Sequence, residues 1–547
     1  SEQIALRQCA EDAMKILNNL KSYAPTHSDA GKKDIYDSEV QIIPSVKELS
    51  LSEDNLEERK EWIYDEASAA QMVYLYGMIS DKFNGNAQKF FNSFSKTKEE
   101  KDAGKKSLRI ASFDIGGGTS DLMITDYTLK DSQYVELLPQ PRYWESFKVA
   151  GDDLVELLIQ HFVIEGEPVA DYQRGACGAI EQELRKLDKN NVGAVLNGFF
   201  GQDSNKIGYR AKLMRTNFVN QIAIPIINEF MERASDNDEV ILSFADIFSE
   251  VPPSPELLDF FATHFGFRFE DLKWKISHAR LKEICELVYN RLFRQLGLII
   301  KAYDCDAIVL SGRPFSLPAM DELIGKFIHL PRNRRINLNT LWIGRWYPFA
   351  DANGYVEDPK TIVCVGSLIS LMGGSLLKMG DFRLDTTILK QSLGSSANYI
   401  GKIANYTIDS AILSPDKNEG SFQVTSLPFQ LGYKKINSTK YPASVLYSFH
   451  INESRVNDIS KKKQGDDVEK MVNSSEDLKF RIRSKMPLKV TISREFVENK
   501  EHLIIEDVID SEGNDLSKAF FELSQQTLTD PAGIWLDTGE FRLSKRS

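Results

Sequence analysis

One short segment of the sequence consists of residue types that bind phosphate: Asp114, Gly116, Gly117, Gly118, Thr119, Ser120 and Asp121. Glycines permit positive φ and let backbone N–H groups approach a phosphate without side-chain obstruction. Asp114 could hold Mg²⁺ through a bound water, and the Thr119 hydroxyl could donate to a phosphate oxygen. Residues 114–121, the glycine turn, are therefore predicted to bind phosphate, although a glycine-rich hairpin without a ligand has the same spacing. No G-x₄-G-K-[ST] segment occurs, so this is not a Walker A loop.

Four further segments contain residues that could complete such a site. They are Glu66 at the start of an alanine-rich helix, Gly151-Asp152-Asp153 before a predicted helix, Ser311-Gly312-Arg313-Pro314 after a predicted strand, and Gly366 in an apolar helix. We expect Gly151 to let the chain turn and Asp152 to cap its helix, so that the helix N-terminus faces the ligand.

The elements that must position these residues are strands and helices in alternation. We predict strands over residues 108–113, 122–126, 143–149 and 307–310, and helices over residues 54–79, from residue 151, and over residues 269–301. This alternation predicts an α/β domain over residues 65–380, with a helical insert at about residues 165–270. Strand patterns at 422–425, 444–451, 488–492 and 503–505, separated by polar stretches such as 452–477, predict a mainly β domain over residues 381–547.

The five segments, in this order, resemble the nucleotide-binding motifs of the actin/Hsp70/sugar-kinase superfamily. The glycine turn resembles its second phosphate loop, and Ile308 to Pro318 resembles its adenosine motif. The segment that contains Glu66 and the segment Asp358 to Ser367, which contains Gly366, resemble its two connecting helices. The resemblance implies ATP and Mg²⁺ as cofactors, and catalytic roles for Asp114 on the metal and for Glu66 on the attacking water. It predicts an actin/Hsp70-like (ribonuclease H-like) ATPase fold followed by a mainly β domain.

Two features depart from the superfamily pattern. Arg313-Pro314 replaces a glycine and its neighbour in the adenosine motif, and Arg313 could stack on the base, bind phosphate, or close the pocket through a salt bridge. The early D-x-G-[TS] phosphate loop is absent from residues 1–64, which would be only a remnant of the first actin-like subdomain. We therefore expect an N-terminally incomplete fold and weak ATP binding by this chain.

The composition limits the other possibilities. The net charge of −12 gives no electrostatic reason to expect a nucleic-acid partner. The apolar run at residues 361–372 is far shorter than the roughly 20 residues that a membrane helix needs, and no transmembrane segment is predicted. Five dispersed cysteines without a CxxC pair indicate a reducing compartment, so we predict a cytoplasmic protein.

Segments such as Ser311 to Pro318 and Leu528 to Gly539 also resemble the bacterial virulence factor SrfB family. The members of that family are longer, so the chain would be their C-terminal portion.

Three functions fit the sequence. The first function is an Hsp70-like ATPase that couples nucleotide-driven cleft closure to binding of a protein partner. The second is a nucleotide-sensing or degenerate scaffold that does not hydrolyse ATP. A sugar-kinase-like phosphotransferase is disfavoured because no G-x-x-D-Q-G-type segment occurs.

Overall fold

The computed structural model describes most of the chain. The described residues are 8–16, 66–95, 107–130, 136–166, 179–187, 191–201, 207–233, 239–374, 382–385, 398–404, 407–438, 441–464, 468–497, 500–525 and 534–543. The chain divides into two compact units, one comprising residues 1–65 and 387–391 and the other residues 66–386 and 392–547. In the first unit, residues 8–16 form a helix. The first part of the helix predicted over residues 54–79 lies outside the described residues.

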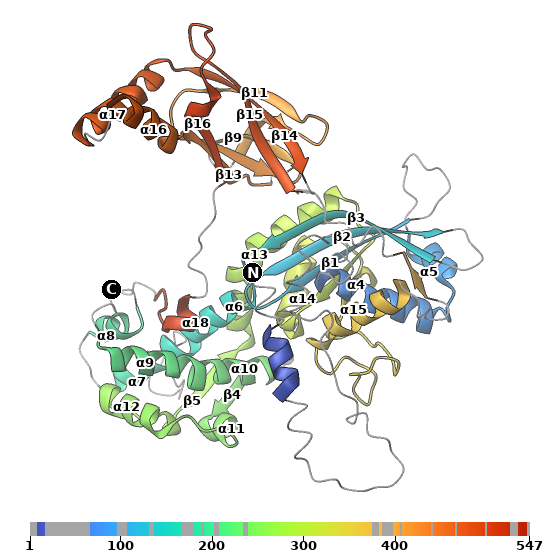
Figure 1. Ribbon diagram of the computed structural model, residues 1–547. Helices are drawn as coiled ribbons and strands as arrows, with labels where there is room; N and C mark the ends of the chain where they lie inside the picture. The colour runs from blue at the N-terminus through green and yellow to red at the C-terminus, as the bar shows by residue number, and fades with distance from the viewer. Residues whose placement is uncertain are drawn as a thin grey trace. The chain divides into compact units, whose positions relative to one another are not determined.

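The second unit contains a six-stranded mixed sheet in the order β7-β6-β1-β2-β3-β8 (Figure 1). The strands are β1 (Ser107–Ile115), β2 (Ser120–Lys130), β3 (Glu136–Phe147), β6 (Ala307–Ser311), β7 (Arg335–Asn337) and β8 (Arg383–Leu384). β2 pairs antiparallel with both β1 and β3, whereas β6 pairs parallel with β1, and β7 pairs parallel with β6. The four strands predicted in this region all fall on or overlap observed strands.

Helices pack on both faces of this sheet at its central strand, β1. On one face, Gln71 of α4 (Glu66–Tyr76) donates to Ser112 Oγ at 2.8 Å. On the other face, Phe113 contacts Phe293 of α13 (His278–Ala302), with ring centroids 6.1 Å apart. Successive side chains of a strand point to opposite faces, so β1 joins two packing layers. The residues at its carboxyl end are thereby fixed from both sides.

The helices α4 and α15 (Thr361–Gly374) lie side by side (Figure 1). A Cβ at Gly366 would lie only 2.0 Å from the carbonyl oxygen of Ala69, so the helices can approach this closely only with glycine there. Ala67, Ala69 and Ala70 are all buried, which explains the run of small residues in this segment. The same unit contains α5 (Ala87–Phe94) and α14 (Pro318–Phe327), and α14 packs against α13.

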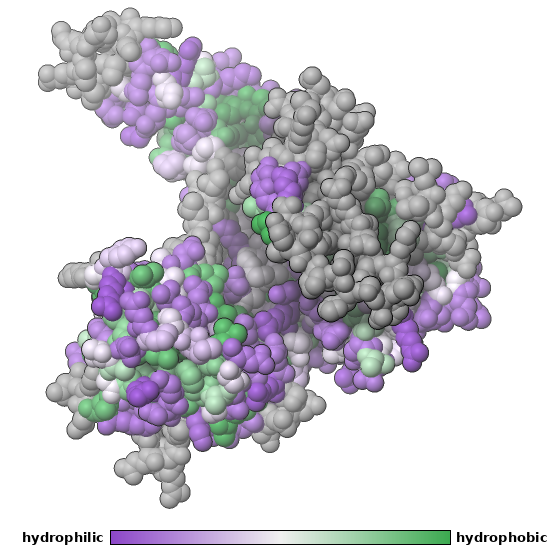
Figure 2. Space-filling model, turned by 60° about the horizontal axis from the view of Figure 1, so that its bottom comes forward, coloured by the Kyte–Doolittle hydropathy of each residue, from purple (hydrophilic) through white to green (hydrophobic). Residues whose placement is uncertain are grey.

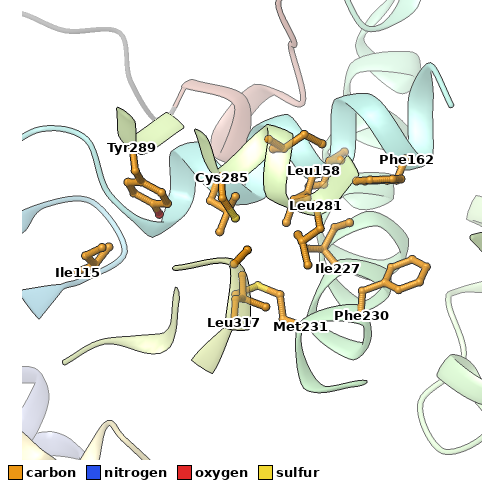
Figure 3. Close-up of a cluster of buried hydrophobic side chains, with 14 of the residues drawn as sticks. Ile115, Leu158, Phe162, Ile227, Phe230, Met231, Leu281, Cys285, Tyr289 and Leu317 are labelled. Carbon is orange, nitrogen blue, oxygen red and sulfur yellow. The ribbon is translucent and has the colours of Figure 1, made fainter. Parts of the chain in front are cut away.

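A largely helical region follows β3. Its elements are α6 (Gly151–Leu158), α7 (Ile180–Lys186), α8 (Val192–Phe199), α9 (Tyr209–Phe218), α10 (Ile224–Arg233), β4 (Glu239–Ser243), α11 (Phe244–Phe248), α12 (Pro255–Phe265) and β5 (Lys273–Ser277). Figure 3 shows how Leu158 of α6, Met231 of α10 and Cys285 of α13 converge in one buried cluster beside Ile115 at the end of β1.

The helix predicted over residues 269–301 was wrong at its start. Residues 273–277 instead form β5, which pairs antiparallel with β4, and α13 begins only at His278. Trp274 and Ile276 are buried while Lys273 is exposed, which is strand alternation over a segment too short to distinguish from a helical pattern. The hydroxyl of Ser277 accepts from Arg280 N at 3.3 Å and caps the helix.

The C-terminal region contains a five-stranded sheet in the order β10-β9-β12-β13-β16 and a three-stranded sheet in the order β11-β14-β15. Their bounds are β9 (Tyr399–Ala404), β10 (Thr407–Leu413), β11 (Glu419–Val424), β12 (Phe429–Lys434), β13 (Ser444–Ile451), β14 (Leu488–Val497), β15 (Lys500–Ile509) and β16 (Phe521–Gln525). The polar stretch 452–477 is not a simple connection, because it contains α16 (Glu453–Gln464) and most of α17 (Val468–Ser484). Val456 and Ile482 bury the apolar faces of these helices against the β core.

The last described helix, α18 (Ile534–Thr538), belongs to the hydrophobic core of the helical region that follows β3. Trp535 and Phe541 are buried there with residues of α8 to α13. None of the described helices combines the length and the apolar composition needed to cross a bilayer. On the face drawn in Figure 2, hydrophilic residues predominate among the described ones and hydrophobic residues are scattered between them, which suits the net charge of −12.

Candidate functional site

The glycine turn joins β1 to β2 as a hairpin. Asp114 pairs with Asp121 and Ile115 with Ser120 in the antiparallel register. The N–H of Gly116 donates to Thr119 O at 2.9 Å and closes the turn. The turn therefore protrudes from the edge of the sheet at which the parallel strands β1 and β6 both end.

Asp114 lies at this edge and is largely buried, with 7% of its surface exposed. Its register partner on β6 is Ser311, whose hydroxyl donates to the Asp114 carboxylate. Burial raises the pKa of Asp114 above its ordinary value, and the hydrogen bond from Ser311 opposes part of that rise. The protein thus holds a destabilised carboxylate in a fixed position, which is typical of residues that act on a ligand or metal.

The N-terminus of α6 docks on the glycine turn. The N–H of Gly151 donates to Gly116 O at 2.8 Å, and the N–H of Asp152 donates to Gly117 O at 2.9 Å. A Cβ at Gly151 would lie 2.9 Å from Gly116 O, so glycine is required for this contact. These two N–H groups hold the turn and are not available to a ligand.

The expectation that Asp152 caps α6 was wrong. The carboxylate of Asp153 accepts from the N–H of Ala150 at 2.7 Å, because the third helical residue can reach back to the residue before the helix. Asp152 instead lies beside the turn, where its carboxylate oxygen would be 3.4 Å from a Cβ on Gly117. Its pKa is raised, mainly by burial and further by the charge of Asp153.

Gly312 follows β6 with φ of +103°, and a Cβ there would lie 2.2 Å from Ile115 O. Glycine alone fits this contact between the two parallel strands. The next residue, Arg313, donates to Asn228 Oδ1 at 2.8 Å and forms an ion pair with Glu232 at 3.3 Å. Of the three roles considered for Arg313, this geometry corresponds to the salt bridge that closes the pocket.

A cavity of about 1120 Å³ opens at the edge of the sheet. It is lined by residues 114–117 of the turn, Gly151 and Asp152 of α6, residues 312–314, residues 357–360 before α15, one face of α10, and Trp535 and Leu536 of α18. Four segments that were predicted to share a site therefore meet around one cavity, although they are spread over more than two hundred residues of sequence.

The remaining predicted site residues are not part of the lining of this cavity, as far as the structure describes them. Gly118 and Thr119 are exposed at the tip of the turn, and Ser120 Oγ donates to Val149 O at 2.6 Å. Asp121 accepts from Thr119 Oγ1 at 3.2 Å and from Ser146. Ser311 donates a hydrogen bond to the lining residue Asp114, and Asp153 fixes the start of α6 by accepting from the N–H of Ala150. Gly366 lies in the contact between α4 and α15. Glu66 begins α4, and its side chain lies outside the described residues.

Sequence reasoning missed two walls of the cavity. Ile224, Asn228, Met231 and Glu232 of α10 line it, at the spacing of one helix face. This spacing was the only available signal, because the four residues match no motif. Trp535 and Leu536 come from a segment noted only for its family resemblance, and no local signal assigned them to a site.

The lining is acidic. Asp114, Asp152, Glu232, Glu357 and Asp358 line the described cavity, against the two cations Arg313 and Lys360. Within the described residues, no group of three or more His, Cys, Asp or Glu side chains is placed so that it could hold a metal ion. A polyphosphate would be repelled unless a divalent cation accompanied it, and carboxylate oxygens are the ligands that Mg²⁺ prefers. The Asp114 and Asp152 carboxylates beside a glycine turn thus fit a magnesium–phosphate group.

The chain is thus a mixed α/β protein whose cavity lies where the parallel strands of its main sheet end. The family model of the virulence factor SrfB matches residues 1–542, so the chain belongs to this family. A comparison with curated proteins gave no match. Membership of this family does not identify a ligand, so nucleotide binding stays a prediction.

Proposed function

We propose that this protein binds a nucleotide with Mg²⁺, with ATP as the first candidate, in an actin/Hsp70-like fold. The observation that carries the proposal is the convergence of four predicted nucleotide-binding segments on one cavity. A chance arrangement of glycine-rich turns would not bring residues 114–117, 151–152, 312–314 and 358–359 to a single space. The cavity volume of about 1120 Å³ is large enough for a nucleoside triphosphate and its metal ion.

The topology supports the proposal. The cavity lies beyond the carboxyl ends of β1 and β6, and open α/β sheets bind ligands at this edge. β1 continues into an antiparallel hairpin on one side and pairs with a parallel strand on the other. The glycine turn and Gly312 are therefore brought to the same edge from different sides of β1, as a phosphate loop and an adenosine loop would require.

The residues that line the cavity suggest a division of roles. When bound, Mg²⁺ would neutralise part of the phosphate charge, and Asp114 and Asp152 would hold it. Asp114 also accepts a hydrogen bond from Ser311, which keeps its carboxylate oriented toward the cavity edge. Lys360 has no ion-pair partner among the described residues and lines the same cavity, so it could pair with phosphate. Closure of this cavity around the nucleotide would couple nucleotide binding to the binding of a protein partner.

A second candidate is a nucleotide sensor that does not hydrolyse its ligand. The N–H groups of Gly151 and Asp152 are already used by the turn, and Arg313 is held by Asn228 and Glu232. Fewer donors are then free to stabilise a transition state than in an active ATPase. This candidate shares the binding step with the first and differs only in turnover.

Binding is tested by equilibrium dialysis of the full chain against Mg·ATP up to 5 mM, because we expect weak affinity. We expect saturable binding, its loss in Gly117→Val, and its retention in Gly208→Ala, a glycine outside the cavity whose added Cβ meets nothing within 4 Å. No saturable binding, or equal binding by Gly117→Val, would refute the proposal. Turnover in the wild type that Asp114→Asn abolishes while it retains binding would identify an ATPase, whereas binding without turnover would identify a sensor.

A further inference from the structure

The segment that closes one side of the cavity comes from far along the sequence. Residues 534–541, the C-terminal strap, contain α18 and lie against α9, as Figure 1 shows. Trp535 and Leu536 of the strap line the same cavity as Asp114 and the glycine turn, although more than four hundred residues separate them. The strap therefore belongs to the wall of the proposed nucleotide site.

A buried arginine holds the strap in place. Arg215 of α9 is 1% exposed, and its Nε donates to Thr538 O at 2.6 Å. Its Nη2 donates to Glu540 at 3.0 Å, and its Nη1 donates to Phe199 O at 2.9 Å. The guanidinium thus joins the strap to α8 and α9 through a fixed fork of donors.

The backbone of the strap is shaped to fit this arginine. Gly539 has φ of +68°, and a Cβ there would lie 2.7 Å from Arg215 Cγ. Beyond it, the N–H of Phe541 donates to Phe200 O at 2.7 Å, and the Phe541 ring lies 5.8 Å from that of Trp535. Contacts on both sides of Gly539 thus fix the strap, and they closely specify the position of Trp535.

The lining of the cavity contains both charged and apolar groups. Asp114 and Asp152 supply carboxylates, whereas Ile224 and Met231 of α10 and Trp535 of the strap supply apolar surface beside the polar Asn228 and Glu232 of α10. A nucleotide has the same division, with a charged polyphosphate and a flat heteroaromatic base. Apolar and aromatic surfaces bind such bases by stacking and exclusion of water.

We propose that the C-terminal strap is the base-recognition wall of the cleft, with Trp535 in contact with the base and Arg215 as the residue that positions it. This inference rests on the proposed function, because it assigns one part of the same ligand. The ligand class it requires is a nucleotide with a heteroaromatic base. A polyphosphate without a base should bind at the glycine turn without any contribution from the strap.

The test compares Mg·ATP with Mg·tripolyphosphate on the full chain by equilibrium dialysis. Because only 3% of Trp535 is exposed, the contact is limited, and we expect Trp535→Ala to weaken Mg·ATP binding about tenfold. Binding of Mg·tripolyphosphate should stay within about twofold of the wild type. Arg215→Ala should reproduce this selective loss, and Arg215→Lys, which keeps the charge without the fork, should recover only part of it.

Tryptophan fluorescence keeps the inference testable if Trp535→Ala or Arg215→Ala fails to fold. Addition of Mg·ATP should change the emission of the wild type and of Trp144→Phe, whose indole is 43% exposed on β3 outside the cavity lining. Trp535→Phe should bind but lose the change. If Mg·ATP binds to the wild type and equally well to Trp535→Ala and Arg215→Ala, the strap inference is wrong and the proposed function stands. If the wild type binds neither ligand, both fall.

Discussion

Gly312 offers the most direct test of how this fold brings two loops together. Its φ is +103°, and a Cβ would lie 2.2 Å from Ile115 O. Gly312→Ala therefore incurs two separate penalties. With ψ of 153°, the backbone of Gly312 lies in a region essentially restricted to glycine, which costs another residue about 1–3 kcal/mol. The steric overlap with a backbone atom, which cannot rotate away as a side chain can, adds about 1–3 kcal/mol. We expect a loss of about 2–6 kcal/mol of unfolding free energy.

Three other glycines separate the two penalties. Gly513 has φ of +87° but nothing within 4 Å of an added Cβ, so Gly513→Ala measures the backbone cost alone. Gly366 has no positive φ, but its Cβ would lie 2.0 Å from Ala69 O, so Gly366→Ala measures the overlap alone. Gly118 has neither feature, and Gly118→Ala should change stability by less than about 0.5 kcal/mol.

The assay is urea unfolding of the full chain, followed by circular dichroism and by intrinsic fluorescence, because a protein of this size need not unfold in one step. The expected order of loss is Gly312→Ala above Gly513→Ala, with Gly118→Ala close to the wild type. Equal losses for Gly312→Ala and Gly513→Ala would refute the close approach of β6 to the end of β1. A loss for Gly118→Ala as large as for Gly312→Ala would refute the reasoning from space.

Three further predictions concern charge and reactivity. Burial raises the pKa of Asp114, so its ionised form destabilises the protein once the pH exceeds the ordinary aspartate range. Asp114→Asn should therefore stabilise the protein by about 1 kcal/mol at pH 7 in melting experiments. The gain should vanish below about pH 3, where the carboxyl is protonated in both the folded and the unfolded protein. Equal gains at both pH values would contradict this cause. Glu145 and Lys435 form a buried ion pair at 2.9 Å, so Glu145→Gln should lower the free energy of unfolding by about 3 kcal/mol, because it leaves the Lys435 charge buried without its partner. Adding Lys435→Met should restore part of this stability, and additive losses in the double variant would refute the pairing. Iodoacetamide at pH 8 should label the exposed Cys364 but not Cys285, because burial raises the pKa of the Cys285 thiol to about 12; peptide mass spectrometry that found Cys285 labelled as fast as Cys364 would disprove its burial.

Local sequence rules predicted the parts of the site that depend on local geometry. The glycine turn, Gly151 and Gly312 could be recognised because each occupies a position where a Cβ meets a backbone oxygen or where φ is positive. Such requirements limit the residue type at one position and are therefore visible in the sequence. The strands that flank these glycines were predictable for the same reason, since their apolar residues must face packed layers.

The remaining parts of the site depend on how distant segments meet. Asn228 and Met231 look like ordinary residues of an amphipathic helix, and nothing in residues 534–538 indicates that they pack beside α9. The capping of α6 by Asp153 instead of Asp152 was decided by one helical position, which no composition rule resolves. The helix predicted from residue 269 failed because five residues with alternating burial fit either period.

The return of the chain to α9 after β16 has a consequence for the architecture. Residues 398–525 begin after β8, which pairs with β3, and end before α18, which packs with α9. The β-rich region is therefore an insertion with two attachment points rather than an appendage with one. The insertion also contacts the main sheet directly, through the ion pair between Lys435 and Glu145 of β3. A change in the position of this insertion would therefore act on β3 through that contact, while the chain that follows it forms part of the cavity wall.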